Sequence, residues 1–208
     1  AVADPAFECE AGLELLVETA RLWRSLGHHD AQGRFRIDGV TGPDEYTAVV
    51  DNNVYTNLMA QRNLREAAEA VRRQPDVAAR LQLSEHEVEV WLRAAALMAV
   101  PYDTQRGVHM QSDGFTHHEQ WDFENTPPER YPLLLHYPYF DIYRKQVIKQ
   151  ADLVLAMHWS PEDFTAEQVA RNVDYYERIT TRDSSLSACT QAVMCAEAGH
   201  LELAHDYA

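Results

Sequence analysis

The 208-residue sequence predicts an all-α fold. Apolar residues recur at helical spacing in several separate runs, and capping residues precede some of them. No segment shows the sustained alternation that is typical of a strand. Long loops rich in glycine, proline and aromatic residues separate the runs. Because loops held by a rigid scaffold often carry binding and catalytic residues, we expect the function to reside in these loops.

The first expected helix covers residues 7–26, where apolar side chains lie three and four positions apart. Gly27 ends it, as glycine commonly does after the last helical turn. Residues 28–46 contain several glycines and a short alternating piece at 34–38. This composition predicts a long, structured loop.

The loop is followed by two further expected helices. Residues 51–73 return to helical spacing, and the Gln-Pro pair that ends at Pro75 predicts a stop. Ser84 and Glu87 form a capping-box pattern ahead of the next apolar run, which Pro101 closes.

The second half predicts another long loop and then several helices. Residues 102–139 lose the periodicity and are rich in proline, histidine and aromatic residues. Helices are expected over 141–159, over 165–178 behind a Thr-x-x-Gln capping box, and from 184 to 198. The run 201–207 has the pattern of a helix still in progress, so we expect the chain to stop in mid-pattern.

Composition excludes several classes of function. A formal net charge of −15 disfavours nucleic-acid binding, which needs lysine and arginine to neutralise phosphates. No apolar stretch approaches the roughly 20 residues of a membrane span. Residues 1–5 lack the features of a targeting peptide, and Cys9, Cys189 and Cys195 form neither a disulfide framework nor a zinc pattern. We therefore expect a cytoplasmic protein without a membrane partner.

Asp44 and Glu45 are adjacent carboxylic acids in a Gly-Pro-Asp-Glu-Tyr loop. Cleavage of a glycosidic bond needs an acid that protonates the departing oxygen. Successive side chains in such a loop diverge, so we expect one carboxylate to face a substrate and the other to stabilise the loop. On spacing alone, the pair would more simply start the next helix, where acidic residues favour the dipole.

Three motifs in one order resemble glycoside hydrolase family 65. The run from Gly39 to Tyr46, continued by Asp-Asn-Asn-Val-Tyr-Thr-Asn at 51–57, is similar to the family signature. The Lys-Gln-Ala-Asp run at 149–152 and the Asp-Ser-Ser-Leu-Ser run at 183–187 resemble two later motifs. The family contains inverting phosphorylases of maltose, trehalose, kojibiose and nigerose, together with some hydrolases.

The resemblance implies a fold and a domain organisation. It covers the chain from about Phe7 to its end and implies an (α/α) six-hairpin barrel, or toroid, with the active site at one mouth. Twelve helices do not fit in 208 residues if each helix and its connection needs roughly 20 or more. Residues 1–208 are therefore expected to be the C-terminal part of a single, incomplete barrel, without the preceding β-sandwich and early barrel helices.

The resemblance also implies roles for particular residues. Glu45 would be the catalytic acid, and Lys149 and Gln150 would bind the glucosyl unit. Phosphate would attack the anomeric carbon from the opposite face, giving β-glucose 1-phosphate, so inorganic phosphate is a co-substrate and no cofactor is expected. The phosphate would be bound by Arg182, Ser184 and Ser185.

Each of these roles has a simpler alternative. Ser184 and Ser185 lie where a helix starts and would also cap it, which is compatible with phosphate binding. Without the resemblance, Lys149 and Gln150 would be solvated helix positions. Phosphorylases of the family often carry histidine where this chain has Arg182. Arginine would hold phosphate through its planar fork, or it would mark a subgroup of hydrolases that use water.

A second cluster of polar residues invites a metal hypothesis. His109, His117, His118 and Glu119 lie close together in the second long loop, but their spacing fits no zinc pattern. The neighbouring Trp121 favours a sugar-stacking surface or plain packing. No metal site is predicted.

The leading hypothesis is thus a phosphorylase of α-linked glucose disaccharides, whose partners are the disaccharide and phosphate. The alternatives are a hydrolase of the same family and a non-catalytic helical scaffold. The fragment itself is expected to be inactive, because missing helices would remove part of the sugar site and the exclusion of water. Exposed apolar helix faces would favour a homo-oligomer. The linkage of the disaccharide is not readable from this sequence.

Overall fold

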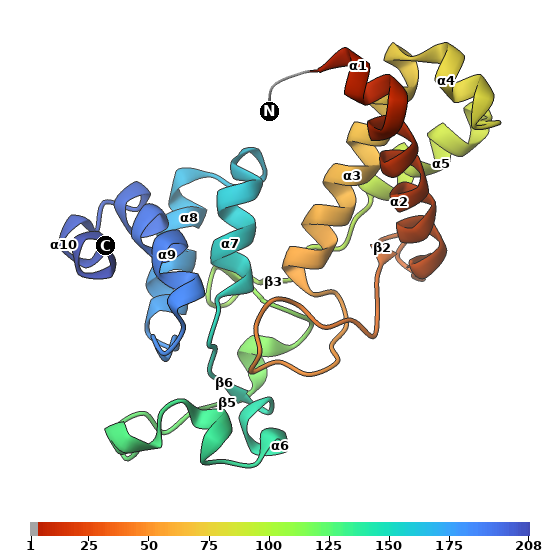
Figure 1. Cartoon of the computed structure of the whole chain (residues 1–208). Coiled ribbons are helices and arrows are strands. Elements are labelled where there is room, and N and C mark those ends of the chain that lie inside the picture. The colour runs from red at the N-terminus through yellow and green to blue at the C-terminus, as the bar shows by residue number, and fades with distance from the viewer. Residues whose placement is uncertain (1–3) are drawn as a thin grey trace. The chain divides into compact units, whose positions relative to one another are not determined.

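A computed structural model describes residues 4–208, and their arrangement is drawn in Figure 1. Residues 1–3 lie outside the described residues. They belong to the stretch 1–5, for which no targeting peptide was expected. The described chain forms two compact units. The first unit runs up to Asp38 and resumes over Asn57–Ala99, and the second contains Gly39–Thr56 and Val100–Ala208.

The first unit is built mainly from helices. A short helix α1 (Pro5–Phe7) and a π-helical turn η1 (Glu8–Gly12) lead into α2 (Leu13–Leu26). Helix α3 (Val54–Arg73) begins in the second unit and continues into this one, where α4 (Pro75–Arg80) and α5 (Glu85–Ala96) follow. These bounds confirm the helices expected over 7–26 and 51–73 and after Ser84.

Helix α2 packs through one face because its apolar residues repeat at helical spacing. Leu13, Val17 and Ala20 are fully buried, whereas Leu15 and Leu22 on other faces are exposed. At the edge of this packing, Arg21 of α2 donates from Nε to Oε1 of Glu87 in α5 at 2.7 Å.

Local signals explain the ends of these helices. Ser84 caps α5, because its hydroxyl oxygen accepts a hydrogen bond from the N–H of Glu87. Pro75 ends α3 as expected, but it also occupies the first turn of α4, a helix that the sequence pattern did not predict. Proline is favoured at that position because its missing N–H would have had no helical partner.

The loop after α2 contains a small hairpin. Strands β1 (His28–His29) and β2 (Phe35–Arg36) pair antiparallel, with His28 opposite Arg36. The buried Phe35 ring lies so close to Gly27 that a Cβ on that glycine would meet the ring at 2.2 Å. Gly27 is therefore required by packing as well as by the end of the helix.

The second unit begins with short strands and turns. Strands β3 (Tyr102–Asp103) and β4 (Val108–His109) pair antiparallel, and β5 (Glu119–Gln120) pairs in parallel with β6 (Lys145–Gln146). Short helical elements lie between and after them. They are the 3-10 turns η2 (Phe115–His117), η3 (Pro128–Arg130), η4 (Leu133–Leu135) and η5 (Pro161–Asp163) and the helix α6 (Tyr139–Ile142).

The helices of the second unit follow. Helices α7 (Asp152–Trp159), α8 (Ala166–Glu177) and α9 (Ser185–Glu197) pack against one another, and α10 (Leu201–Tyr207) folds back on α9. The capping box predicted at Thr165 is present, because the Thr165 and Gln168 side chains bond each other's backbone N–H groups. Within residues 4–208, none of the helices combines the length and apolar character that a membrane crossing requires.

The helix expected over 141–159 is wrong in its first part. The chain leaves α6 at Ile142, passes through β6 and stays non-helical up to Ala151. Its backbone bonds partners far along the chain, since the N–H of Ile148 donates to the carbonyl of Ile179 at 3.0 Å. These long-range bonds replace helical ones. They also place Lys149 and Gln150 in a non-helical bend before α7 instead of the solvated helix considered above.

Candidate functional site

Glu45 lies in a closed loop of the second unit. Val40 and Val50 exchange both backbone hydrogen bonds, at 2.9 and 2.8 Å, and so close residues 40–50 into a ring that we call the Glu45 loop. Helix α3 follows at Val54, so Asp44 and Glu45 do not start it. The simpler explanation of this acidic pair is therefore wrong.

Asp44 is fully buried, and its carboxylate organises two stretches of chain. Oδ1 accepts hydrogen bonds from the backbone N–H groups of Tyr46, Lys149 and Gln150 at 3.2, 2.9 and 3.2 Å. Oδ2 accepts from the side chains of Thr47 and Gln111, both at 2.9 Å. Asp44 is thus the loop-stabilising member of the pair, and it fixes the Lys-Gln segment directly to the Glu45 loop.

Glu45 is exposed where Asp44 is buried, and it meets the side chains of the two residues expected to bind sugar. Its Oε2 pairs with the ammonium group of Lys149 and accepts a hydrogen bond from Nε2 of Gln150 at 3.4 Å. The N–H of Glu45 also donates to Oε1 of Gln150 at 3.3 Å. The sequence separates these residues by more than 100 positions, and the fold brings all three together.

The same contacts set the protonation state of Glu45. The hydrogen bond from Lys149 is the main cause that lowers the pKa of Glu45 below its ordinary value, and Gln150 adds to it. Partial burial of the half-exposed Glu45 side chain opposes this effect, but the pKa remains below its ordinary value. Glu45 is therefore ionised at neutral pH while Lys149 holds it, whereas a proton donor must carry its proton.

Asp152 is a second buried acid, at the start of α7. It is fully buried, and its Oδ2 accepts a hydrogen bond from Nδ2 of Asn53 at 2.7 Å. Its Oδ1 has no hydrogen-bond partner among residues 4–208. Burial, followed by the neighbouring charge of Asp44, raises the pKa of Asp152 well above its ordinary value. Burial also raises the pKa of Asp44, but the donors around its oxygens oppose the rise.

Gly42 provides the space that this network needs. A Cβ at that position would lie 2.1 Å from Oδ2 of Asp152 and 2.3 Å from Nδ2 of Asn53. Real Cβ contacts are never so short, so any side chain would displace the buried hydrogen bond. The glycine of the Gly-Pro-Asp-Glu sequence is thus fixed by close approach of side chains from two other segments.

Tyr46, on the other side of Glu45, contacts the segment 182–185. Its hydroxyl donates to Oδ2 of Asp183 at 2.6 Å and accepts from the N–H of Leu133 at 2.9 Å. Its ring lies in a buried cluster with Leu133, Ile142 and Val147. Burial and the Asp183 carboxylate both raise the pKa of Tyr46, so the phenol keeps its proton.

Arg182 is exposed, and its charge is already paired. Its guanidinium forms an ion pair with Glu177 of α8 and lies 5.3 Å from the ring centroid of Tyr207. Tyr207 in turn donates to both carboxylate oxygens of Glu177, each at 2.9 Å. The backbone of Arg182 has φ 59°, a left-handed conformation that is uncommon for a residue other than glycine.

Ser184 and Ser185 lie at the start of α9, as the sequence predicted. The hydroxyl oxygen of Ser184 accepts a hydrogen bond from the N–H of Leu186 at 3.3 Å and so caps the helix. Ser185 is exposed. A pocket of about 230 Å³ beside them is lined by Arg182, Ser184, Ser187, Ala188, Asp206 and Tyr207. Two of the three residues expected to bind phosphate therefore line one pocket.

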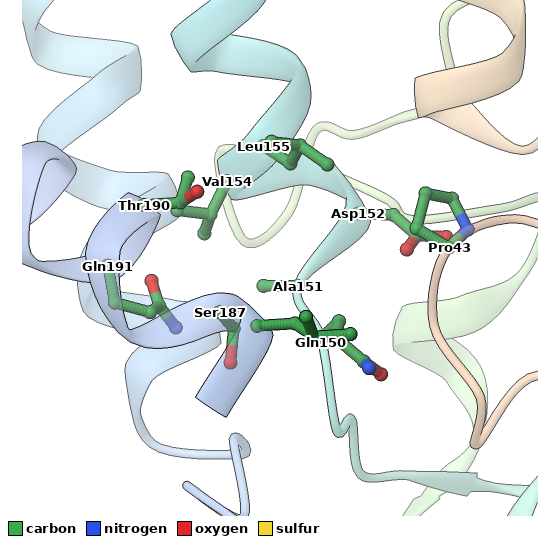
Figure 2. A pocket seen from close by; sticks show the side chains of 10 residues that line it. Pro43, Gln150, Ala151, Asp152, Val154, Leu155, Ser187, Thr190 and Gln191 are labelled. Carbon is green, nitrogen blue, oxygen red and sulfur yellow. The ribbon is translucent and has the colours of Figure 1, made fainter. Parts of the chain in front are cut away.

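A second pocket, of about 210 Å³, lies between the start of α7 and α9 (Figure 2). Pro43, Gln150 and Asp152 line it on one side, and Ser187, Thr190 and Gln191 of α9 line it on the other. Ala151, Val154, Leu155 and Leu186 complete a mainly apolar wall. Gln150, which is expected to bind sugar, lines this pocket, but Glu45 is not among its described lining residues, so the pocket lies beside the expected acid.

The histidine cluster proves to be divided between several environments. His109 is buried, and its Nδ1 lies 3.1 Å from Nδ2 of Asn172. Burial is the main cause that lowers the pKa of both His109 and His118. Glu119 pairs instead with Lys145. Within the described part of the chain, no group of three potential metal ligands converges.

Sequence reasoning missed three residues that build the site. Gln111 donates to Oδ2 of Asp44 from a loop without periodicity, and no local signal marks it. Tyr46 and Asp152 were quoted within the motifs but received no role. Tyr46 is buried next to Asp183, and Asp152 is buried next to Asp44. These neighbours lie far apart in the sequence, so no local pattern indicates them.

Comparisons with known proteins show which family this chain resembles. The family model of the glycosyl hydrolase family 65 central catalytic domain matches residues 1–208. An uncharacterized glycosyl hydrolase from Mycobacterium tuberculosis is 62% identical over 206 residues, which are 99% of this chain and 26% of the relative. An α,α-trehalose phosphorylase from Geobacillus stearothermophilus is 50% identical over 205 residues, covering 94% of this chain and 26% of the relative.

A solved structure has the same fold. It is a protein from the human microbiome with a provisional assignment as kojibiose phosphorylase, and it has a TM-score of 0.88 at 28% identity. The match covers 98% of this chain and 31% of that one. The chain therefore spans about a quarter of the length of the curated relatives that it matches. The predicted fold class, an all-α part of an (α/α) barrel, is confirmed.

Proposed function

Because the chain belongs to glycosyl hydrolase family 65, within its central catalytic domain, we propose that the protein cleaves an α-linked glucose disaccharide by inverting phosphorolysis. The products are β-glucose 1-phosphate and glucose. The proposal is supported by the trehalose phosphorylase from Geobacillus stearothermophilus, which is 50% identical. The observation that carries it is the convergence of Glu45, Lys149 and Gln150 at one point.

In the proposed reaction, Glu45 gives its proton to the oxygen between the two sugars as the bond to the anomeric carbon breaks. An oxygen of phosphate forms the new bond to that carbon from the opposite face. Lys149 and Gln150 hold hydroxyl groups of the glucosyl unit. The chain then needs no nucleophile of its own and no cofactor, since inorganic phosphate is the co-substrate.

Lys149 has a second effect in this proposal. While its ammonium group pairs with Glu45, it keeps that carboxyl ionised. When a sugar hydroxyl takes over the ammonium group, Glu45 loses its main source of positive charge, and its pKa rises. Exclusion of water around the bound sugar acts in the same direction. Substrate binding thus supplies the protonated acid that the reaction consumes.

Phosphate is proposed to bind near Ser184 and Ser185. The first turn of α9 carries backbone N–H groups without helical partners and the positive end of the helix dipole, which together favour an anion. Arg182 lines the adjacent pocket, although its charge is shared with Glu177. This shared charge is the feature that favours the second candidate, a hydrolase of the same family in which water takes the place of phosphate.

The experiment that separates the two candidates uses the full-length protein. We would incubate it with trehalose, maltose or kojibiose, with and without phosphate, and measure glucose and glucose 1-phosphate. Phosphorolysis requires phosphate and yields one glucose 1-phosphate for each glucose released. Release of two glucose molecules without phosphate would establish the hydrolase instead. The acceptor-side linkage follows from the disaccharide that is consumed.

The Glu45→Gln variant tests the acid itself. It keeps the size of the side chain and its hydrogen bond to Gln150 but cannot donate an acidic proton, so turnover should fall by about 100-fold or more. A loss of only a few-fold would exclude the role of Glu45 and leave the non-catalytic scaffold as the better explanation.

We further propose that these 208 residues are the C-terminal part of a longer (α/α) barrel domain in a cytoplasmic enzyme. The support is that the relatives are about four times longer than the matched region. On this proposal the isolated chain is inactive and forms homo-oligomers through apolar helix faces. Turnover by the isolated chain would contradict the first statement, and a monomer in light scattering would contradict the second.

A further inference from the structure

The two residues next to Glu45 in the sequence are each bound to a different motif. On one side, Asp44 accepts hydrogen bonds from the N–H groups of Lys149 and Gln150, at 2.9 and 3.2 Å. On the other side, the hydroxyl of Tyr46 donates to Asp183 at 2.6 Å. Glu45 itself is half exposed, and its carboxylate meets the Lys149 ammonium group. The backbone of Glu45 is therefore held from both sides.

The hydrogen bond between Tyr46 and Asp183 is short and partly buried, and other hydrogen bonds hold both of its partners. Tyr46 is 1% exposed. The N–H of Leu133 donates to its hydroxyl oxygen at 2.9 Å, which leaves the hydroxyl proton for Asp183. The hydroxyl of Thr181 donates to the other oxygen of Asp183 at 2.6 Å. Each of the two side chains is thus held by a further hydrogen bond of its own, as precise positioning requires.

Asp183 lies between Arg182 and Ser184, in the segment where phosphate is proposed to bind. Its carboxylate is directed to Tyr46 and Thr181. A carboxylate that faced the phosphate would repel it. The Asp183 carboxylate instead accepts a hydrogen bond from each of two hydroxyl groups, which stabilise its negative charge in that orientation. This arrangement explains how an aspartate is accommodated in the middle of an anion-binding segment.

We propose that Tyr46 and Asp183 are positioning residues, whose hydrogen bond sets the distance between the proton donor Glu45 and the 182–185 segment that binds phosphate. The inference rests on the proposed phosphorolysis. In that reaction the leaving oxygen must receive its proton while phosphate attacks from the opposite face, so acid and phosphate must be held at a fixed separation. Displacements of about 1 Å can cost about 100-fold in rate.

The test compares two substrates in the full-length protein with phosphate present. Cleavage of the disaccharide requires a proton for the leaving sugar oxygen. Cleavage of α-glucosyl fluoride does not, because fluoride departs as an anion. The ratio of the two kcat values is independent of the fraction of folded enzyme, so it reports the position of the acid and not general damage.

The variants are Tyr46→Phe, Asp183→Ala and Asp183→Asn, and the matched control is Tyr175→Phe. Tyr175 also donates its hydroxyl to a side chain, but the acceptor, Oε1 of Gln146, lies in β6, outside the Glu45 loop and the 182–185 segment. Tyr46→Phe and Asp183→Ala should lower the ratio of disaccharide to fluoride cleavage by about tenfold or more and raise the KM for phosphate. Asp183→Asn keeps an oxygen that accepts from Tyr46, so it should restore most of the ratio.

An unchanged ratio in Tyr46→Phe, or an equal fall in Tyr175→Phe, would overturn the positioning role. Failure of the proposed function gives a different result. In that case the wild-type protein would cleave without phosphate, or Glu45→Gln would leave the ratio unchanged.

Discussion

The ammonium group of Lys149 pairs with Oε2 of Glu45. The residue expected to bind sugar and the expected proton donor therefore contact each other. This pair connects two functions that the sequence treats as separate motifs. Any change at Lys149 must therefore affect both the binding of sugar and the protonation of Glu45.

The first prediction concerns Lys149→Met. Lys149 lowers the pKa of Glu45, so its removal raises that pKa. Activity that depends on protonated Glu45 is lost as pH rises through the pKa, and the falling limb of kcat/KM against pH should move to higher pH. The KM for the disaccharide should also rise. Lys145→Met is the control, because it removes the same charge from the pair with Glu119. A falling limb at the wild-type position would contradict the prediction.

The second prediction concerns the ion pair between Arg182 and Glu177. Glu177→Gln keeps a group that accepts from Tyr207 but removes the negative charge that Arg182 faces. If Arg182 binds phosphate, its field at the pocket becomes stronger and the KM for phosphate falls. Glu167→Gln serves as the control, because it removes an equal charge from another pair on the same helix, with Arg171. An equal fall in both variants would show only a general effect of net charge.

The third prediction separates helix capping from phosphate binding at the start of α9. Ser184→Ala removes the hydroxyl oxygen that accepts from the N–H of Leu186, so the free energy of unfolding should fall by about 1 kcal/mol. Ser185→Ala affects an exposed residue and should leave stability unchanged. Both variants should raise the KM for phosphate. Thermal unfolding and phosphate titration together check the prediction. A KM that changes in neither variant would leave Ser184 a cap alone.

The fourth prediction concerns the buried acid Asp152. Its pKa is raised in the folded state, so the folded protein binds more protons there than the unfolded chain. Stability due to Asp152 is therefore present below the ordinary aspartate pKa and is lost as pH rises through the raised value. Asp152→Asn should be more stable than wild type at pH 7, on the order of 1 kcal/mol.

The stabilisation by Asp152→Asn should shrink as pH is lowered to about 4, the ordinary pKa of aspartate, because Asp152 is then protonated in the wild type as well. Denaturant unfolding of the two proteins at both pH values checks this. A difference in stability that stays constant with pH would show that Asp152 keeps its charge in the folded protein.

The sequence predicted those parts of the fold that depend on local chemistry. Ser84 and Thr165 cap their helices as expected. Each hydroxyl accepts from an N–H three residues later, so the sequence alone contains both partners of the bond. The segment 145–150 was predicted wrongly, because Val147 and Ile148 have the spacing of a buried helix. The backbone partners of Ile148 lie at 179–181, and nothing in the local pattern indicates a partner so far along the chain.

For the candidate site too, the residues within motifs were predicted and the residues placed by long-range contacts were not. The resemblance assigned Glu45, Lys149 and Gln150 to one site, and the structure brings them together, while their roles stay predictions. The different surroundings of Asp44 and Glu45 followed from loop geometry. Gln111 was not predictable, since its role is to satisfy an acceptor on a residue 67 positions away. The pairing of Arg182 with Glu177, only five positions earlier, was missed for a different reason: Arg182 lies beyond the end of α8, so helical spacing does not indicate the pair.

The absence of space at Gly42 also bears on how this protein can evolve. A side chain there would push Asp152 and Asn53 apart, so libraries that randomise position 42 should return almost only glycine. Val49, on the same loop, is 70% exposed and free of this constraint. Laboratory evolution of substrate preference should therefore proceed through exposed positions such as Val49, while the buried turn before Glu45 is inherited unchanged.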